Sequence, residues 1–303
     1  MKTKAEYESA GKPLTKEALT ARIERFVEES PLNRIRAEDA IYPELAGVRL
    51  FEAPLIGVSS ALDPLYTEEF KREGVISPEY LAPCEWLPGA KSVISFFLPF
   101  TEEVRRSNRA KVDTPYENGL PQRAGAAWLH GRIEGQEMIN ALTDYIQKLL
   151  TEAGMENICP TTSGQLRMIT PYISTWSERH AAYASGLGTF GLSKGLITKK
   201  GMAGRFGSVI TAGEFPADVR PYTDAFEYCI LCGACQSRCP AGAIRIERGC
   251  ALGKDQTICG PYIREGWLPP HGPQGIVRYG CGKCQVAVPC ESQIPIKGSG
   301  QFK

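Results

Sequence analysis

The sequence predicts an α+β fold in two parts, an α/β domain over residues 1–214 and a small cysteine-rich domain over residues 215–303. Two observations support this division. Apolar stretches with strand and helix periodicity alternate through the first part, and the cysteines concentrate in the second. A stretch with proline and aspartate, FPADVRPYTDAF at 215–226, is typical of a linker between them. The 303 residues are enough for two such domains.

The elements of the first domain follow from periodicity and from end signals. Residues 15–29 space apolar side chains at helical intervals, and APLIGVSS from 53 and KSVISFFLPF from 91 are typical of buried strands. A long amphipathic helix is predicted over 122–152 and a second helix over 176–185, and a glycine follows each of them. GLSKGLIT and GRFGSVITAG then follow as β-rich stretches that are broken by glycines.

The cysteine-rich domain begins with the spacing C-x2-C-x2-C-x3-C-P. This is the bacterial ferredoxin pattern, in which three thiolates bind one 4Fe-4S cluster and the fourth binds a neighbouring cluster. The pattern therefore predicts two 4Fe-4S clusters and electron transfer. The expected ligands are Cys229, Cys232, Cys235 and Cys290 for the first cluster and Cys239, Cys259, Cys281 and Cys284 for the second. Cys250 is an alternative to Cys259, and Cys259 is preferred.

Other uses of so many cysteines are disfavoured. Disulfides suit secreted chains, whereas the N-terminus, MKTKAEYESAGKPLTKEAL, has no apolar core, twin arginine or cleavage site. Zinc could use four cysteines, but the C-P ending and the small apolar residues after it are typical of ferredoxin loops. No apolar run approaches the roughly 18 residues needed to span a bilayer, and the net charge is +1. We expect a cytoplasmic protein that requires neither a membrane nor a nucleic acid.

The glycine-rich stretch matches two known motifs in spacing only. Gly186-Leu-Gly188-Thr-Phe-Gly191 has the spacing of a dinucleotide-binding loop, and Gly191-Leu-Ser193-Lys-Gly195 has that of a nucleophile elbow. Both motifs require a strand followed by a helix, whereas here a predicted helix comes first and a strand follows. We interpret the glycines as tight turns or as points where the backbone closely approaches a bulky ligand.

Several of these segments together resemble the epoxyqueuosine reductase family. They are SERHAAYASGLGTFGLSKGLIT at 177–198, GSVIT from 207, LPGAKSVISFFLPF at 87–100 and the cysteine pattern. The resemblance implies a nitroreductase-like cobalamin-binding domain, as in reductive dehalogenases and a cobalamin-processing chaperone, followed by a two-cluster ferredoxin-like domain. The candidate cofactor-binding residues are Gly186, Leu187, Gly188, Thr189, Phe190, Gly191, Ser193 and Gly207.

The sequence departs from that family at the position of its catalytic aspartate, where Tyr172 stands here, and Leu192-Ser193 replaces a Lys-Asn pair. Reductive dehalogenases, by resemblance, use a tyrosine as acid. A phenol with an ordinary pKa of about 10 is protonated at neutral pH, so Tyr172 is the candidate catalytic proton donor. The alternatives are that Tyr172 only packs with its hydroxyl hydrogen-bonded, and that Glu178 and Arg179 pair structurally.

The implied cofactor also bears on the histidines and on the remaining cysteines. Low-potential clusters can deliver single electrons to a corrinoid cobalt. The histidines, His130, His180 and His271, are scattered, and no D-x-H-x-x-G corrinoid signature is present. We therefore expect cobalamin to bind without a protein histidine on cobalt. Cys84 and Cys159 are expected to be buried free thiols.

The predicted function is that of a corrinoid-dependent iron–sulfur reductase acting on an unknown small molecule. The alternatives are an electron-transfer or corrinoid-activating protein without its own substrate, and an epoxyqueuosine reductase acting on tRNA. The tRNA substrate ranks last because the chain ends 13 residues after Cys290 without C-terminal helical repeats, and because its charge is near neutral. A flavin in place of the corrinoid is a further alternative. The expected partner is a low-potential electron donor, ferredoxin or flavodoxin.

Overall fold

The computed structural model describes residues 14–110, 123–265 and 267–296. Its centre is a four-stranded antiparallel sheet in the order β1–β2–β8–β3. These strands are β1 (Leu55–Ser60), β2 (Ser92–Pro99), β8 (Gly204–Thr211) and the short β3 (Asn157–Ile158). The predicted α+β class and the strands expected from residues 53 and 91 are confirmed. β2 lies between two neighbours and is buried along its whole length, which explains its continuous apolar run.

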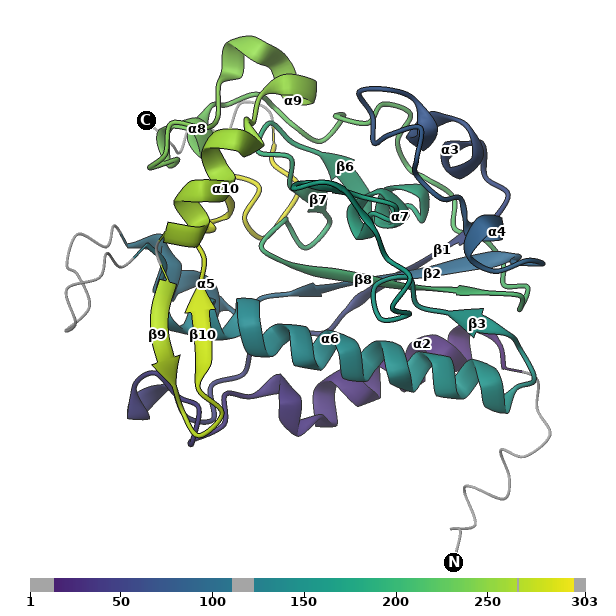
Figure 1. The fold of residues 1–303 in the computed structure, drawn as a ribbon, viewed down its shortest axis with the longest axis horizontal. Coiled ribbons are helices and arrows are strands. Elements are labelled where there is room, and N and C mark those ends of the chain that lie inside the picture. Colours follow the sequence, from purple (N-terminus) through teal and green to yellow (C-terminus); the bar gives the residue numbers. More distant parts are fainter. Residues whose placement is uncertain (1–13, 111–122, 266, 297–303) are drawn as a thin grey trace, which may run out of the picture.

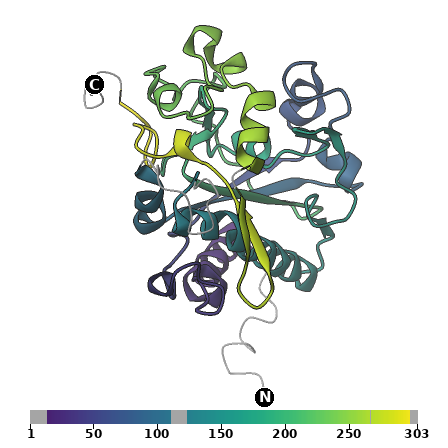
Figure 2. The same cartoon turned by 60° about the vertical axis from the view of Figure 1, so that its left-hand side comes forward.

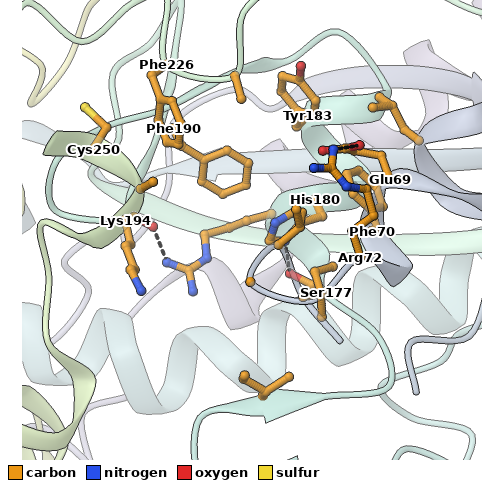
Figure 3. A pocket seen from close by; sticks show the side chains of 18 of the residues that line it. Glu69, Phe70, Arg72, Ser177, His180, Tyr183, Phe190, Lys194, Phe226 and Cys250 are labelled. Carbon is orange, nitrogen blue, oxygen red and sulfur yellow. Dashed lines mark hydrogen bonds and ion pairs between the residues drawn. The ribbon is translucent and has the colours of Figure 1, made fainter. Parts of the chain in front are cut away.

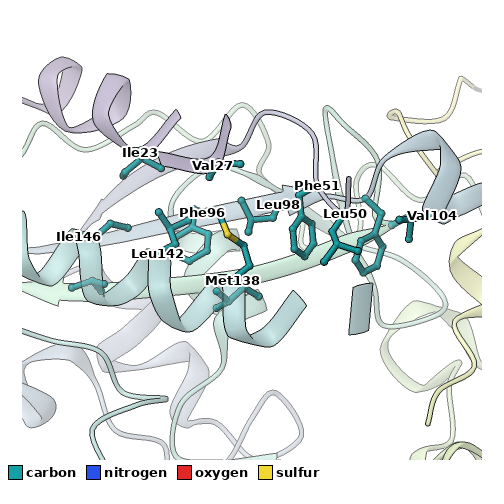
Figure 4. Packing of buried hydrophobic residues seen from close by; sticks show 14 of the residues in the cluster. Ile23, Val27, Leu50, Phe51, Phe96, Leu98, Val104, Met138, Leu142 and Ile146 are labelled. Atoms are coloured by element: carbon teal, nitrogen blue, oxygen red, sulfur yellow. The ribbon is translucent and has the colours of Figure 1, made fainter. Parts of the chain in front are cut away.

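Two helices, α2 (Lys16–Glu29) and α6 (Ala126–Glu152), cover one face of the sheet (Figure 1). Both were predicted, although α6 begins at residue 126, and residue 122 lies outside the described part. Successive side chains of a strand point to opposite faces, so alternate residues of β2 pack against these helices. The buried residues of this layer include Ile23, Val27, Phe96, Leu98, Met138, Leu142 and Ile146 (Figure 4).

The opposite face carries α7 (Glu178–Ala184) and the hairpin of β6 (Gly188–Phe190) and β7 (Leu196–Thr198) (Figure 1). Helix α7 confirms the second predicted helix, and the glycine-rich stretch follows a helix and enters a strand, as expected. Trp176, just before α7, is buried and lies parallel to the rings of Tyr66 and Tyr80. This packing fixes the start of α7 against the sheet.

The remaining elements of this part are short. They are α3 (Pro64–Thr67), α4 (Pro83–Trp86), α5 (Glu102–Arg109), the strand pair β4 (Met168–Thr170) and β5 (Ile173–Ser174), and the 3-10 turns η1 (Pro31–Asn33), η2 (Pro43–Leu45) and η3 (Glu69–Lys71). Within the part of the chain that the structure describes, no helix combines the length and the apolar character that crossing a bilayer requires.

The cysteine-rich part lies over the α7 side of the sheet and also reaches around it. Its elements are α8 (Ala234–Ser237), η4 (Ile246–Arg248), α9 (Gly249–Leu252), α10 (Gln256–Glu265), the hairpin of β9 (Trp267–His271) and β10 (Ile276–Tyr279), and η5 (Lys283–Gln285). The β9–β10 hairpin extends from α10 to the side of α6 (Figure 1, Figure 2). The side chain of His271 lies outside the described part. The domain boundary at residue 214 stays a prediction.

A buried ion pair fixes the β9–β10 hairpin to α6. Arg278 is fully buried and donates through Nε to Glu134 Oε1 at 2.8 Å and through Nη2 to the carbonyl oxygen of Asp39 at 3.0 Å. Glu134 Oε1 also lies 3.2 Å from Nδ1 of His130, whose Nε2 accepts the N–H of Ile41 at 3.1 Å. Burial alone would raise the pKa of Glu134, but His130 and Arg278 hold it below its usual value. His130 is therefore a structural residue.

Helix α5 holds the C-terminal segment in place. The Lys283 ammonium donates to the carbonyl oxygen of Asn108 at 3.0 Å, and Nη2 of Arg109 donates to Glu291 Oε1 at 2.6 Å. Gly282, beside Lys283, has φ of +69°, and a Cβ there would lie 2.2 Å from the Trp128 ring. A glycine is thus required for the segment with the last three predicted cluster ligands to reach this position.

Candidate active site

The eight predicted cluster ligands fall into two groups, each around its own cavity. Cys229, Cys232, Cys235 and Cys290 line a cavity of about 20 Å³. Cys239, Cys259, Cys281 and Cys284 line another of about 110 Å³. The grouping is the one that the cysteine spacing predicts. All eight side chains are free of disulfides, so all are available as ligands.

The sulfurs within each group act on one another. Burial and the neighbouring sulfurs raise the pKa of the Cys281 thiol to about 11 and that of Cys290 further. Four neighbouring thiolates repel one another, and the positively charged iron atoms of a cluster would offset this repulsion. Among the described residues, no three His, Cys, Asp or Glu side chains are close enough to hold one metal ion, whereas a cubane spreads its four sulfur ligands more widely.

Cys250 lies with the first group and not with the second. Burial and the neighbouring Cys229 sulfur raise the pKa of its thiol, and its side chain lines a third, larger cavity. Cys259 lines the cavity of the second group from α10. Cys250 is therefore not placed to replace Cys259. Of the two cysteines of the first domain, Cys159 is buried as expected, whereas Cys84 is only partly buried.

The β6–β7 hairpin holds the first cysteine group in place. Thr189 Oγ1 accepts the N–H of Tyr228 at 2.9 Å, which fixes the chain immediately before the first ligand. After β7, the N–H of Met202 donates to the carbonyl oxygen of Cys290 at 3.0 Å. The glycine-rich stretch thus brings together two segments that lie far apart in the sequence.

The third cavity measures about 1570 Å³ and lies between α7, α9 and the segment around α3 and η3 (Figure 3). Aromatic side chains form much of its wall. The ring of His180 lies 5.0 Å from that of Phe70 and 4.6 Å from that of Phe190, measured between centroids, and Tyr183 and Phe226 also line the cavity. Sites for drug-sized ligands measure roughly 300–1,000 Å³. This cavity is large enough for a flat macrocycle and a second, small molecule.

Of the eight predicted cofactor-binding residues, Phe190 and Gly191 line this cavity. The other six lie away from its wall, in the hairpin, the turn before it or the sheet: Gly186, Leu187, Gly188, Thr189, Ser193 and Gly207. Gly207 lies beneath Phe96 on the α6 face of the sheet, where a Cβ would come within 2.3 Å of the ring. Gly188 and Gly207 allow close approach between parts of the chain, and cofactor binding by these six residues stays a prediction.

The large cavity reaches both cysteine groups. Gly191 lines it and also the cavity of the first group, and a Cβ on Gly191 would lie 3.8 Å from the sulfur of Cys229. Lys254 lines it and also the cavity of the second group. Gly191 and Lys254 therefore each border both the large cavity and the cavity of one cysteine group.

Tyr172 lies between β4 and β5 and lines the large cavity. Its hydroxyl accepts a hydrogen bond from Nη2 of Arg264 at 3.4 Å, and its ring packs against Gly260 of α10. The side chain is still 36% exposed. The expected hydrogen bond is present, and the phenol nevertheless faces the space where a ligand would lie.

Glu178 and Arg179 also line the cavity, but they do not pair with each other, and the prediction of a structural pair is wrong. The hydroxyl of Ser208 donates to Glu178 Oε2 at 2.5 Å, and Arg179 donates to the carbonyl oxygen of Lys194. Consecutive residues of a helix point in different directions, which explains why each finds another partner.

Glu178 is the functional candidate that sequence reasoning missed. Burial raises its pKa to about 7, although hydrogen bonds from Ser208, Trp176 and Thr161 lower it. A carboxyl group with a pKa near the working pH is an effective proton donor. Its place at the start of a helix gave no signal of this, because acidic residues at such positions are usually exposed.

We expect Glu178 to titrate at about pH 7, as its raised pKa implies. The infrared carbonyl band of a protonated carboxylic acid should disappear around that pH and be absent in Glu178→Gln. Since the folded-state pKa exceeds the ordinary 4.5, the folded state binds more protons between these two values. Stability should therefore fall as pH rises through this window, and Glu178→Gln should remove that dependence.

A second variant tests the cause of this pKa. Ser208→Ala removes a hydrogen bond that favours the ionised form, so it should raise the midpoint further. A wild-type midpoint at or below pH 4.5, the ordinary value, would contradict the assignment.

Comparisons with known proteins bear on the cysteine-rich part and on the fold. A family model of the 4Fe-4S binding domain matches residues 224–245. A comparison with curated proteins gave no match. Among solved structures, the catabolic reductive dehalogenase NpRdhA has a TM-score of 0.51 and 13% identity over 98% of this chain and 40% of that chain. The chain shares the fold of part of that protein.

Two further structures complete this comparison. A reductive dehalogenase structure that suggests a mechanism for B12-dependent dehalogenation has a TM-score of 0.50 and 13% identity over 98% of this chain and 40% of that one. A selenomethionine-labelled epoxyqueuosine reductase has a TM-score of 0.47 and 17% identity over 78% of this chain and 61% of that one. The chain thus spans less than two thirds of the length of each of these three proteins.

Proposed function

We propose that this protein is a corrinoid-dependent iron–sulfur reductase in which two 4Fe-4S clusters supply electrons to a corrinoid in the large cavity. The observation that carries the proposal is that Gly191 and Lys254 each line both this cavity and the cavity of one cysteine group. The match to the 4Fe-4S binding domain and the fold shared with a B12-dependent dehalogenase support it. The substrate is an unknown small molecule that enters the same cavity.

The residues of the cavity fit a corrinoid. The aromatic rings of Phe70, Tyr183 and Phe190 offer flat apolar surface, and Gly191 lets the backbone approach closely. His180 also lies there, but its Nδ1 is hydrogen-bonded to Ser177 Oγ at 2.8 Å, and its ring packs between aromatic neighbours. When bound, a corrinoid supplies a low-valent cobalt that acts as a reductant or nucleophile.

The protein itself supplies the proton that a reduction consumes. Tyr172 and Glu178 reach the cavity from different elements, the β4–β5 turn and the start of α7. The pKa of Glu178 of about 7 leaves a substantial protonated fraction at neutral pH. Tyr172 is proposed as the donor to substrate because it is the more exposed of the two residues, and Glu178 is proposed as a second proton source on the cavity wall. Ferredoxin or flavodoxin in the cytoplasm is proposed as the electron source.

The proposal predicts the metal content of the protein. Purified without oxygen from cells supplied with cobalamin, each chain should contain about eight irons, matching sulfide and about one cobalt. About eight irons with no cobalt, and none taken up on reconstitution, would instead favour an electron carrier or a flavoprotein.

The role of Tyr172 is tested separately from cofactor binding. Tyr172→Phe should bind cobalamin and permit reduction of cobalt as the wild type does, because the change removes only a hydroxyl. Turnover of a substrate found by screening should fall by about 10²–10⁴-fold, the usual contribution of a general acid. Unchanged turnover would leave Tyr172 a packing residue.

A further inference from the structure

Three cationic side chains gather at the end of the large cavity nearest the cysteines. Arg179 comes from α7, Lys194 from the β6–β7 turn and Lys254 from the loop before α10. Burial and then the charges of Arg179 and Lys254 lower the pKa of the Lys194 amine, so the three groups interact. Figure 3 shows the hydrogen bond that joins this arginine to the carbonyl oxygen of Lys194. We refer to these three residues as the basic end.

The basic end differs from the other cations on the cavity wall. Arg72 pairs with Glu69 at 2.6 Å, and Arg220 pairs with Asp63. Within the described residues, no carboxylate oxygen lies within 4.0 Å of a nitrogen of the basic end. The charge of Asp255 raises the pKa of Lys194, but this carboxylate already accepts hydrogen bonds from Thr257.

The cysteine sulfurs can balance only part of the positive charge of the basic end. Lys254 faces the sulfurs of Cys284 and Cys259, so a cluster there would balance it. Cys284 also acts on Arg179, but no cysteine acts on Lys194. Arg179 exposes its surface to the cavity, and a ligand that fills the cavity would displace the water there. A cation that loses its water is stabilised by an anionic partner, so a ligand that carries negative charge is favoured there.

The backbone of Lys194 supports a binding role. Its φ is +59°, a left-handed conformation that is uncommon in residues other than glycine. The turn is held by the N–H of Lys194, which donates to the carbonyl oxygen of Gly191 at 2.8 Å. Such conformations of residues other than glycine are strained and occur often at ligand sites. Glycine would fit this turn more easily, yet it would leave no cation in the cavity.

We propose that Arg179 and Lys194 bind an oxyanion, a phosphate or a carboxylate, on a molecule that occupies the large cavity. A guanidinium presents paired N–H groups that match such an anion. This inference rests on the proposed function and adds to it the chemical class of the ligand. The oxyanion comes either from the phosphodiester in the nucleotide loop of the corrinoid or from an acidic group of the substrate.

The test compares Arg179→Gln and Lys194→Gln with Arg72→Gln, a matched control whose cation lines the same cavity but is already paired. Iron content and circular dichroism first establish that each variant is folded and loaded with clusters. Calorimetry then measures the binding of cobalamin and of cobinamide, which lacks the nucleotide loop. If the phosphodiester is the ligand, the first two variants should bind cobalamin about 10- to 100-fold more weakly and cobinamide normally.

A second titration tests the other source. Cobalamin-loaded protein is titrated with benzoate and with the neutral benzamide as carboxylate and control probes. If the anion belongs to the substrate, benzoate should bind to the wild type and to Arg72→Gln at least about tenfold more tightly than to the two variants. Variants that bind cobalamin and benzoate as the wild type does would overturn the oxyanion site alone. A wild type that binds neither corrinoid would overturn the proposed function and, with it, this inference.

Discussion

Replacing Cys290 by alanine is expected to remove one cluster and to leave the other, so that iron falls from about eight to about four per chain. Cys290 is one of the four cysteines that line the smallest cavity. The second group shares none of its four cysteines with the first, so its cluster should persist. Iron and sulfide analysis measures the loss, and electron paramagnetic resonance of the reduced protein should show one cluster without magnetic coupling to another.

Cys250→Ala is the matched control for this prediction. Cys250 contacts the sulfur of Cys229 but lines neither cysteine cavity, so its loss should leave about eight irons. Cys259→Ala should instead remove the second cluster. A full iron content in Cys290→Ala, or a loss in Cys250→Ala, would show that the ligand sets differ from the two groups described.

Arg278→Met is expected to destabilise the protein by about 3–5 kcal/mol, the usual cost of leaving one partner of a buried ion pair alone. Glu134 would keep a buried charge with only His130 beside it. The free energy of unfolding can be followed by circular dichroism in urea without oxygen, with wild type and variants compared under the same conditions.

The controls separate burial from charge. Arg72→Met breaks an exposed pair with Glu69 and should cost less than about 1 kcal/mol. The double change Arg278→Met and Glu134→Leu removes both buried charges and should recover most of the loss. Equal costs for the buried and the exposed pair would mean that the β9–β10 hairpin does not depend on this anchor.

Local patterns predicted the elements whose burial repeats regularly. The helix over residues 16–29 was predictable because it buries one regular face. The strand at 92–99 was predictable because it is buried on both faces and is therefore apolar along its length. Cysteine spacing predicted which cysteines gather in each of the two groups, because ligands of a cubane lie at constrained spacings in the chain. Strands as short as Asn157–Ile158 have no period to detect.

The cavity was harder to predict because its wall is assembled from distant segments. Glu178 looks like an ordinary helix-start carboxylate until Trp176 and Ser208 surround it. In the sequence, Lys194 is only a lysine in a glycine-rich turn. The fold places Arg179 of α7 beside it, which the sequence does not indicate. The glycines nearby were predicted to touch a cofactor, since a requirement for close approach does not reveal whether the neighbour is a ligand or the chain itself.

The anchoring of the C-terminal segment on α5 has a consequence for how the protein matures. Residues 224–245, the match to the 4Fe-4S binding domain, contain four cysteines but complete neither cavity. Of the missing sulfurs, that of Cys259 lies on α10, whereas those of Cys281, Cys284 and Cys290 lie on the segment that Lys283 and Glu291 anchor to α5. If the two groups hold clusters, neither cluster has all four of its ligands until this segment is in place on α5. Damage to α5 should first appear as a chain that folds but cannot retain iron.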